Sequence, residues 1–186
     1  MNEEQAVSAA ILCGGQSSRM GRNKAFVEVG GVPVIERVIA QVRPLTDDLL
    51  LITNTPAEYT HLGLPSYPDR LPGKGSLGGL YTALSYARHP YLLLVSCDQP
   101  FLNGDLLRYL IGLRAGVDVV VPLARDGYPQ SMHAVYSKGC RPAIEAQIAA
   151  DRLKMIGFFP QVRVREASGG EIDRFDPERL SFTNLN

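Results

Sequence analysis

A short apolar run that ends in a pair of glycines constrains the fold of this chain more than any other feature. The run, residues 6–12, has the length and composition of a buried strand, and Gly14 and Gly15 follow it after one residue. Glycine has no Cβ atom that would keep a polyanion away from the backbone amides. Serine hydroxyls and two cations, Arg19 and Lys24, come next. This order of residues predicts a strand that opens into a phosphate-binding loop.

Two familiar nucleotide-binding motifs do not fit this loop. A Walker loop needs Gly, four further residues and then Gly-Lys-Ser/Thr, and the segment after Gly15 lacks that ending. The Gly-x-Gly-x-x-Gly spacing of the dinucleotide-binding fingerprint is also missing, and no clear acidic residue follows on a second strand. An ordinary glycine turn with Arg19 and Lys24 on the surface therefore remains the alternative interpretation.

The composition indicates one folded domain without nucleic-acid or membrane partners. The chain has 186 residues, of which 45% are hydrophobic, and this suits a single domain that covers residues 1–186. Because 19 basic residues balance 19 acidic ones, the broad positive field of a nucleic-acid-binding protein is not expected. The apolar runs are shorter than a membrane span, and the acidic start is unlike a signal peptide. We therefore expect a cytoplasmic protein.

The cysteines indicate reduced thiols. Cys13, Cys97 and Cys140 are odd in number and lack the spacing of a zinc site, which disfavours both a disulfide framework and a structural metal. Cys13 is not expected to act as a nucleophile, since no histidine lies near it in the sequence.

Polar residues follow two of the apolar runs at the point where each run ends. Residues 49–53 have the continuous apolar character of a strand inside a parallel sheet, and Asn54 comes directly after them. Ligands gather at the carboxyl ends of strands in open α/β sheets, so the amide of Asn54 could hydrogen-bond a base or ribose. Its alternative role is that of a turn former beside Pro56.

The second of these runs starts at Tyr91 and leads to Asp98. A carboxylate is a hard oxygen ligand suited to Mg²⁺, which takes one or two carboxylates and completes its shell with water and phosphates. Asp98 could instead cap the next helix, but Asn103 or Asp105 would cap residues 106–110 more naturally. We therefore favour a metal-binding role for Asp98.

The remaining segments predict alternating helices and strands. Apolar spacing predicts a helix from Pro33 to residue 42, and a second glycine-rich loop, residues 67–80, is expected to meet the first loop before a helix that begins at residue 80. Lys74 in that loop is either a solvated charge or a phosphate contact. Further expected elements are strands at 117–122, 130–136 and 161–165, a turn at 125–129 and a helix at 141–150. His133 is expected to be a core or surface residue rather than a catalyst, and Arg163 and Arg165 are expected to be solvated.

The pattern Leu-x-Gly-Gly-x-Ser-x-Arg-Met-Gly-x-x-Lys, residues 12–24, resembles the signature loop of nucleotidyltransferases, and most closely that of molybdenum cofactor guanylyltransferases. Cys13 stands where these enzymes usually have Ala. The Gly14-Gly15 pair, in place of Ala-Gly, favours the guanylyl branch over cytidylyl and sugar-nucleotide enzymes. The resemblance covers nearly the whole chain from Ala6 onward. It implies an α/β, three-layer Rossmann-like fold of the nucleotide-diphospho-sugar transferase type, with a mostly parallel central sheet.

The resemblance also implies roles for individual residues. A similar Asp followed by Gly-Pro-Leu-x-Gly lies against the nucleotide in these enzymes, and Asp69 matches it, with Ser76 in place of the Pro. Asp98 matches the aspartate of Cys-Asp-x-Pro, which binds Mg²⁺. Catalysis is expected to involve Arg19, Lys24 and Asp98. Nucleotide binding is expected at Leu12, Cys13, Gly14, Gly15, Lys24, Asn54, Asp69 and Asp98. Acceptor binding is expected at Gly79, Asn184 and Asn186, although the family's Asn-x-Asn normally leads into Thr-Pro and a final helix, and this sequence ends at Asn186.

The implied reaction transfers GMP from GTP to the phosphate of molybdopterin, which yields the guanine dinucleotide cofactor and pyrophosphate. Expected partners are GTP, the molybdenum cofactor, and cofactor carrier proteins or apo-molybdoenzymes. The alternatives are a cytidylyltransferase that acts on the same pterin, a sugar-phosphate nucleotidyltransferase, and a GTP-binding accessory module without activity.

Overall fold

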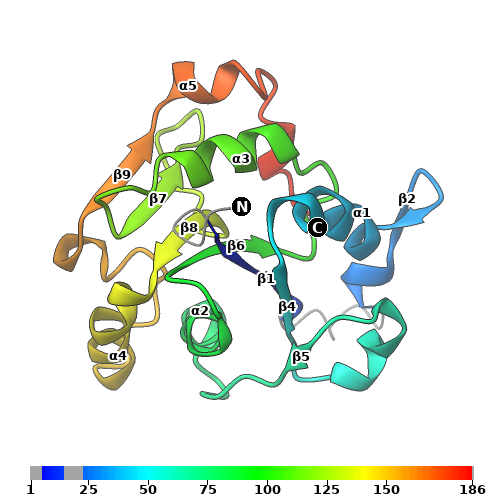
Figure 1. The fold of residues 1–186 in the computed structure, drawn as a ribbon, viewed down its shortest axis with the longest axis horizontal. Helices are drawn as coiled ribbons and strands as arrows, with labels where there is room; N and C mark the ends of the chain where they lie inside the picture. The colour runs from blue at the N-terminus through cyan, green and yellow to red at the C-terminus, as the bar shows by residue number, and fades with distance from the viewer. Residues whose placement is uncertain (1–5, 15–22, 186) are drawn as a thin grey trace.

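A seven-stranded sheet forms the middle layer of the computed structural model, which describes residues 6–14 and 23–185 (Figure 1). The strand order is β5-β4-β1-β6-β8-β7-β9. β8 runs antiparallel to β6 and β7, and the other neighbouring strands are parallel. The sheet is therefore mixed and mostly parallel, as predicted. Its strands are β1 (Ser8–Leu12), β4 (Asp48–Ile52), β5 (Ser66–Tyr67), β6 (Tyr91–Ser96), β7 (Val119–Pro122), β8 (His133–Ser137) and β9 (Val164–Ala167).

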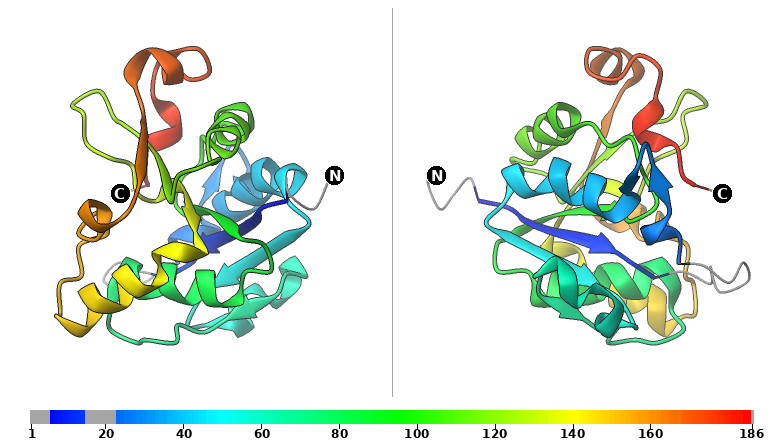
Figure 2. Two further views of the ribbon diagram at one scale, coloured as in Figure 1. Left: turned by 60° about the vertical axis from the view of Figure 1, so that its left-hand side comes forward. Right: turned by 90° about the vertical axis from the view of Figure 1, so that its right-hand side faces the viewer.

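Helices cover both faces of the sheet, so the three-layer prediction is confirmed. Both views in Figure 2 show the sheet between two helical layers. One apolar core lies under α1 (Val34–Val42), α3 (Gly104–Gly112) and α5 (Gly169–Asp173). A second core lies under α2 (Gly75–Tyr86) and α4 (Arg141–Ala149). A small hairpin of β2 (Glu28–Val29) and β3 (Val32–Pro33) precedes α1.

The central position of β1 follows from its composition. All five of its residues are buried, because helices cover it on both faces and β4 and β6 flank it. Leu12 pairs with Ile52 on β4 and with Ser96 on β6. The carboxyl ends of these three parallel strands therefore meet at one edge of the sheet, which is where ligands bind in open α/β folds.

The helix α2 begins at Gly75, five residues before the expected start. Its glycines do not form a loop, because they let the first turn of the helix pack closely against its neighbours. A Cβ atom on Gly79 would lie 3.1 Å from Leu12 Cδ1, and one on Gly78 would lie 2.9 Å from Lys74 Cβ. Real Cβ atoms rarely approach so closely. The first turn of α2 is thus pressed against β1 and the preceding loop.

The strands β7, β8 and β9 begin later than expected, and β7 does so by two residues. The strand expected at 130–136 begins at His133, because residues 130–132 belong to a turn. The strand expected at 161–165 is β9, which begins at Val164. A 3₁₀ turn over Phe159–Gln161 occupies the start of that expected strand.

The expected cap is confirmed, since Asn103 Oδ1 accepts hydrogen bonds from the amides at the start of α3. Among the described residues, no helix combines the length and apolar character needed to cross a membrane.

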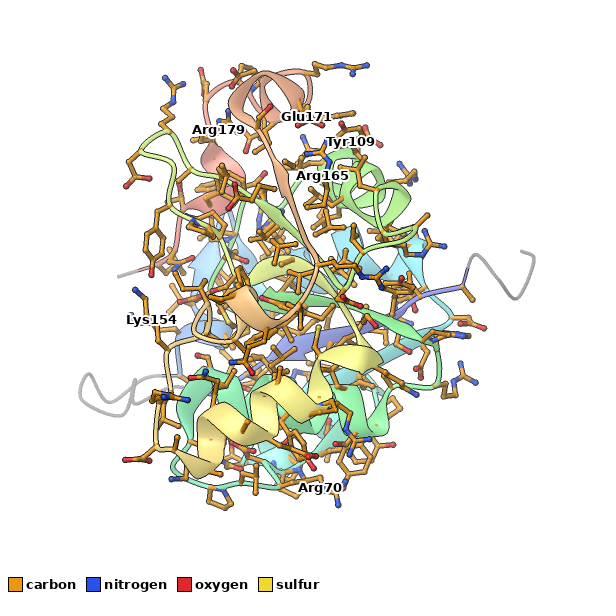
Figure 3. The ribbon with its side chains drawn as sticks, turned by 90° about the vertical axis from the view of Figure 1, so that its left-hand side faces the viewer. Arg70, Tyr109, Lys154, Arg165, Glu171 and Arg179 are labelled. Atoms are coloured by element: carbon orange, nitrogen blue, oxygen red, sulfur yellow. The ribbon has the colours of Figure 1, made fainter. Side chains whose placement is uncertain are left out.

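An ionic network around Glu171 joins β9, α3 and α5, as Figure 3 shows with labelled side chains. Arg165 Nη2 lies 2.5 Å from Glu171 Oε1, and Tyr109 Oη donates to the same oxygen at 2.7 Å. The expectation that Arg165 is merely solvated is therefore wrong, and Arg163 likewise pairs with Asp118, with 3.0 Å between Nε and Oδ2. The hydrogen bonds from Arg165 and then Tyr109 lower the pKa of Glu171 to about 2.

This network predicts a pH-dependent stability. The folded pKa of Glu171 lies below its ordinary value of 4.5, so the charged carboxylate stabilises the fold above that value. The contribution is lost as the pH falls toward 2. We expect Glu171→Gln to lower the melting temperature at pH 7 by roughly 2–4 °C, which corresponds to about 1 kcal/mol for a chain of this size.

Thermal unfolding followed by circular dichroism at pH 7, 5 and 3 measures this effect. Glu178→Gln is the matched control, because Glu178 is exposed and no hydrogen bond joins its side chain to another described residue. The difference between Glu171→Gln and the wild type should shrink toward pH 3. A difference of constant size across that range would contradict the assignment.

Candidate active site

The peptide groups of Leu185 join the two residues predicted to act on phosphates. Lys24 Nζ donates a hydrogen bond to the carbonyl oxygen of Leu185 at 2.9 Å. The amide of Leu185 in turn donates to the carbonyl oxygen of Asp98 at 2.9 Å. Lys24 follows the first loop, Asp98 follows β6 and Leu185 belongs to the C-terminal segment. Three segments that are distant in sequence thus meet at the carboxyl edge of the sheet.

The carboxylate of Asp98 has the position and freedom that a cation ligand requires. It is half-buried, and Ser96 Oγ donates to its Oδ1 at 2.5 Å, which fixes the orientation of the group. Among the described residues, Asp98 forms no ion pair and its second carboxylate oxygen accepts no hydrogen bond. The described part of the chain contains no cluster of three or more candidate ligands. A cation held by Asp98 would therefore complete its shell mainly with water and phosphate oxygens, as Mg²⁺ commonly does.

The side chain of Asn23 positions Lys24. Its Nδ2 donates to Glu58 Oε2 at 2.8 Å and to Tyr59 Oη at 2.9 Å. Its Oδ1 accepts from the amide of Ala25 at 3.1 Å and so caps the 3₁₀ turn that begins at Lys24. Sequence reasoning missed this role, although an Asn directly before a short helical turn is a recognisable cap signal.

A second group of site residues surrounds Asp69. Asn54 Oδ1 accepts a hydrogen bond from the amide of Asp69 at 3.0 Å. The carboxylate of Asp69 accepts from Thr82 Oγ1 at 2.8 Å and from the amide of Leu71 at 3.1 Å, both through Oδ1. Thr82 is fully buried in α2, and its hydroxyl also accepts from the amide of Arg70 at 3.0 Å. The structure thus brings Asn54 and Asp69 together and adds Thr82, which the sequence did not indicate.

Several predicted residues contribute backbone or lie outside the described part of the chain. Gly14 is exposed, and a Cβ atom there would meet no atom of the described residues within 4 Å, so close packing against them does not explain this glycine. Gly79 packs closely against the buried side chain of Leu12, and this packing explains why the residue is a glycine. The contact of Gly79 with an acceptor stays a prediction. Asn184 is exposed directly before Leu185. The remaining predicted residues, Gly15, Arg19 and Asn186, lie outside the described residues.

Cys13 is buried at the end of β1, and its environment favours the protonated thiol over the thiolate. The neighbouring Cys97 thiol, followed by burial, raises the pKa of the Cys13 thiol well above its ordinary value. Cys13, Cys97 and Cys140 are free thiols in this structure.

Two further side chains do not join the site. Lys74 pairs with Asp151 at 2.8 Å on the surface. His133 is fully buried, and burial lowers its pKa to about 4, so it stays neutral near pH 7. Its ring packs edge-on against Phe182, with 5.1 Å between centroids. His133 is therefore a core residue beneath the C-terminal segment, as the sequence suggested.

Comparison with known proteins places the chain among nucleotidyltransferases. Residues 9–161 match the family described as the MobA-like NTP transferase domain. A probable molybdenum cofactor guanylyltransferase of Carboxydothermus hydrogenoformans is 40% identical over 161 residues, which cover 87% of this chain and 81% of the relative. The molybdenum cofactor guanylyltransferase of Desulfosudis oleivorans is 35% identical over 183 residues, which cover 97% and 90%.

A solved structure agrees with these relatives. The crystal structure of molybdopterin-guanine dinucleotide biosynthesis protein A from Archaeoglobus fulgidus superimposes with a TM-score of 0.81 at 25% identity, covering 97% of this chain and 92% of that one. The predicted family and the predicted fold are therefore both confirmed. This chain belongs to the MobA-like family of nucleotidyltransferases.

Proposed function

We propose that this chain transfers GMP from GTP to the phosphate of molybdopterin and releases pyrophosphate. The observation that carries the proposal is the junction of Lys24 and Asp98 at Leu185, beside the start of the phosphate-binding loop. An ammonium group and a carboxylate at one sheet edge suit a reaction that moves phosphate groups. The relatives named molybdenum cofactor guanylyltransferases support the choice of nucleotide and acceptor.

The proposed reaction is a direct substitution at the α-phosphorus of GTP. An oxygen of the molybdopterin phosphate forms a bond to that phosphorus, and the bond from the α-phosphorus to the oxygen that bridges to the β-phosphate breaks. Pyrophosphate leaves with the electron pair of the broken bond. The protein then contributes by orienting the reactants and by stabilising charge, so no enzyme nucleophile is required.

Each described site residue has a part in this proposal. The ammonium of Lys24 faces the triphosphate and stabilises charge on the leaving group, with Arg19 and the loop amides as further donors. Asp98 would hold Mg²⁺, and the bound ion would supply neutralisation of phosphate charge. Asn54 and Asp69 offer an amide and a carboxylate to the ribose or base. The acceptor would lie near Asn184 and Asn186, with Gly79 on the side of α2.

We also propose that the reaction takes place in the cytoplasm within the single domain of residues 1–186. The cofactor would then pass between carrier proteins or apo-molybdoenzymes and this chain. Pyrophosphate release from GTP in the presence of purified molybdopterin tests the function directly. GTP binding without pyrophosphate release would favour an accessory binding module instead.

The role of Asp98 predicts the effect of removing its charge. Asp98→Asn keeps the size of the side chain and an oxygen that can accept from Ser96 Oγ, so the fold should persist. The loss of the anionic ligand should reduce Mg²⁺-dependent turnover by about 100-fold or more. Turnover measured against Mg²⁺ concentration provides the readout.

Asp47→Asn is the matched control for this variant. Asp47 makes its ion pairs with Arg88 and His89 just before β4, at the opposite edge of the sheet, so the same chemical change should leave turnover near the wild-type level. Wild-type turnover in Asp98→Asn would rule out the metal assignment.

The hydrogen bond from Thr82 Oγ1 should hold the carboxylate of Asp69 in position. Thr82→Val preserves the shape of the side chain but removes the donor to Asp69 and the acceptor for the Arg70 amide. Hydrogen bonds to charged groups contribute about 1.5–3 kcal/mol, so we expect the KM for GTP to rise about tenfold. Thr82→Ser retains the hydroxyl and should restore a KM close to that of the wild type.

The control for Thr82→Val is Ser85→Ala on the same helix. Ser85 Oγ donates to the carbonyl oxygen of Tyr81 and does not contact Asp69, so its loss should not change the KM. If Thr82→Val lowered the melting temperature but left the KM for GTP unchanged, Thr82 would be a structural residue only.

A further inference from the structure

Cys13 and Cys97 occupy equivalent positions on neighbouring strands. Leu12 of β1 pairs with Ser96 of β6, and each cysteine follows its partner in that pair by one residue. The parallel pairing continues past the strand ends, because the amide of Cys97 donates to the carbonyl oxygen of Leu12 at 3.1 Å. The two cysteines are therefore next to each other at the carboxyl edge of the sheet.

Their side chains also lie on the same face of the sheet. Both belong to the apolar core under α1 and α3, with Cys13 buried and Cys97 half-buried. The Cys13 thiol donates to the carbonyl oxygen of Ile11 at 3.7 Å, and the neighbouring Cys97 thiol contributes to raising the pKa of Cys13. Cys140, in contrast, belongs to the core on the other face, where its thiol donates to the carbonyl oxygen of Asp118.

The separation of these two backbone positions suits a disulfide. Neighbouring strands lie about 4.7–4.9 Å apart. Disulfide-bonded cysteines have Cα atoms roughly 4.4–6.8 Å apart, so the usual spacing of an in-register pair on neighbouring strands falls inside that range. Since Cys97 is half-buried while Cys13 is 7% exposed, an oxidant from solvent would reach Cys97 first.

We propose that Cys13 and Cys97 form a modification site at which a peroxide produces a reversible disulfide. Cys97 sulfur attacks the peroxide, the O–O bond breaks, and Cys97 sulfenic acid and one water form. The Cys13 thiol then attacks the sulfenic sulfur and gives its proton to the departing oxygen, so the S–S bond forms, the S–O bond breaks, and a second water leaves. Two thiols supply the two electrons that reduce one hydrogen peroxide, and an added dithiol reverses the bond.

The disulfide would act on the residues that follow each cysteine. Gly14 follows Cys13 at the start of the phosphate-binding loop, and Asp98 follows Cys97. An S–S bond of about 2.05 Å is shorter than the contact between two thiols, so its formation rotates both side chains and restrains the two segments that carry them. A displacement of about 1 Å in a catalytic site can lower the rate about 100-fold. This effect on turnover rests on the proposed function, whereas formation of the bond does not.

Peroxide treatment of the full chain tests the proposal. The protein is exposed to hydrogen peroxide, and linked peptides are identified by mass spectrometry after digestion. The wild type should lose the mass of two hydrogen atoms and yield a peptide that joins Cys13 to Cys97. Its turnover should fall at least about tenfold and recover with dithiothreitol. Cys140→Ala should behave in the same way, because Cys140 lies on the other face.

The paired variants identify the bond. Neither Cys13→Ala nor Cys97→Ala can form the linked peptide. The turnover of each variant after peroxide treatment is compared with the turnover of the same variant in its reduced form. Cys97→Ala should lose no turnover on oxidation. Absence of the linked peptide in the wild type, or sulfinic acid at Cys97 in its place, would overturn the modification site. If the wild-type protein forms the disulfide but keeps its turnover, the proposed effect of the disulfide on activity is wrong. If the reduced protein never releases pyrophosphate, only the proposed function is contradicted.

Discussion

The parallel pairing of β1 with β4 and β6 determines where the candidate site lies. Because the three strands end at the same register, the residues that follow them arrive together at one sheet edge. Gly14 follows β1, Asn54 follows β4 and Asp98 follows β6. The apolar character of these strands buries them on both faces, and this fixes the backbone from which the polar residues project. A shift of the register would separate these residues.

The C-terminal segment completes the arrangement that the sheet begins. The carboxylate of Asp176 accepts hydrogen bonds from the amides of Leu180 and Ser181, at 3.0 and 2.9 Å, and so holds the start of the segment. Phe182 packs on the ring of His133, and Leu185 then reaches both Lys24 and Asp98. The position of Lys24 relative to the strand ends thus depends on a segment more than 150 residues away in sequence.

Local patterns in the sequence were enough to predict the apolar strands and the polar residues at their ends, because burial on two faces requires continuous apolar runs. The three-layer arrangement was predicted from the family resemblance. Contacts across long sequence separations could not be predicted in the same way. The backbone of Leu185 carries no residue-specific signal, and Thr82 lies in an apolar helix where nothing local indicates its bond to Asp69. The glycines before residue 80 resembled a loop, since only the packed structure reveals that Leu12 leaves no room for a Cβ atom at Gly79.

The choice of nucleotide tests the central claim most directly. A site built to hydrogen-bond one base leaves polar groups unpaired when it binds another, and this produces a strong preference rather than graded tolerance. The measurement compares pyrophosphate release from the four nucleoside triphosphates with purified molybdopterin and identifies each product by mass. The account predicts that GTP is turned over fastest and yields the guanine dinucleotide. Faster turnover of CTP, with the cytosine dinucleotide as product, would contradict it.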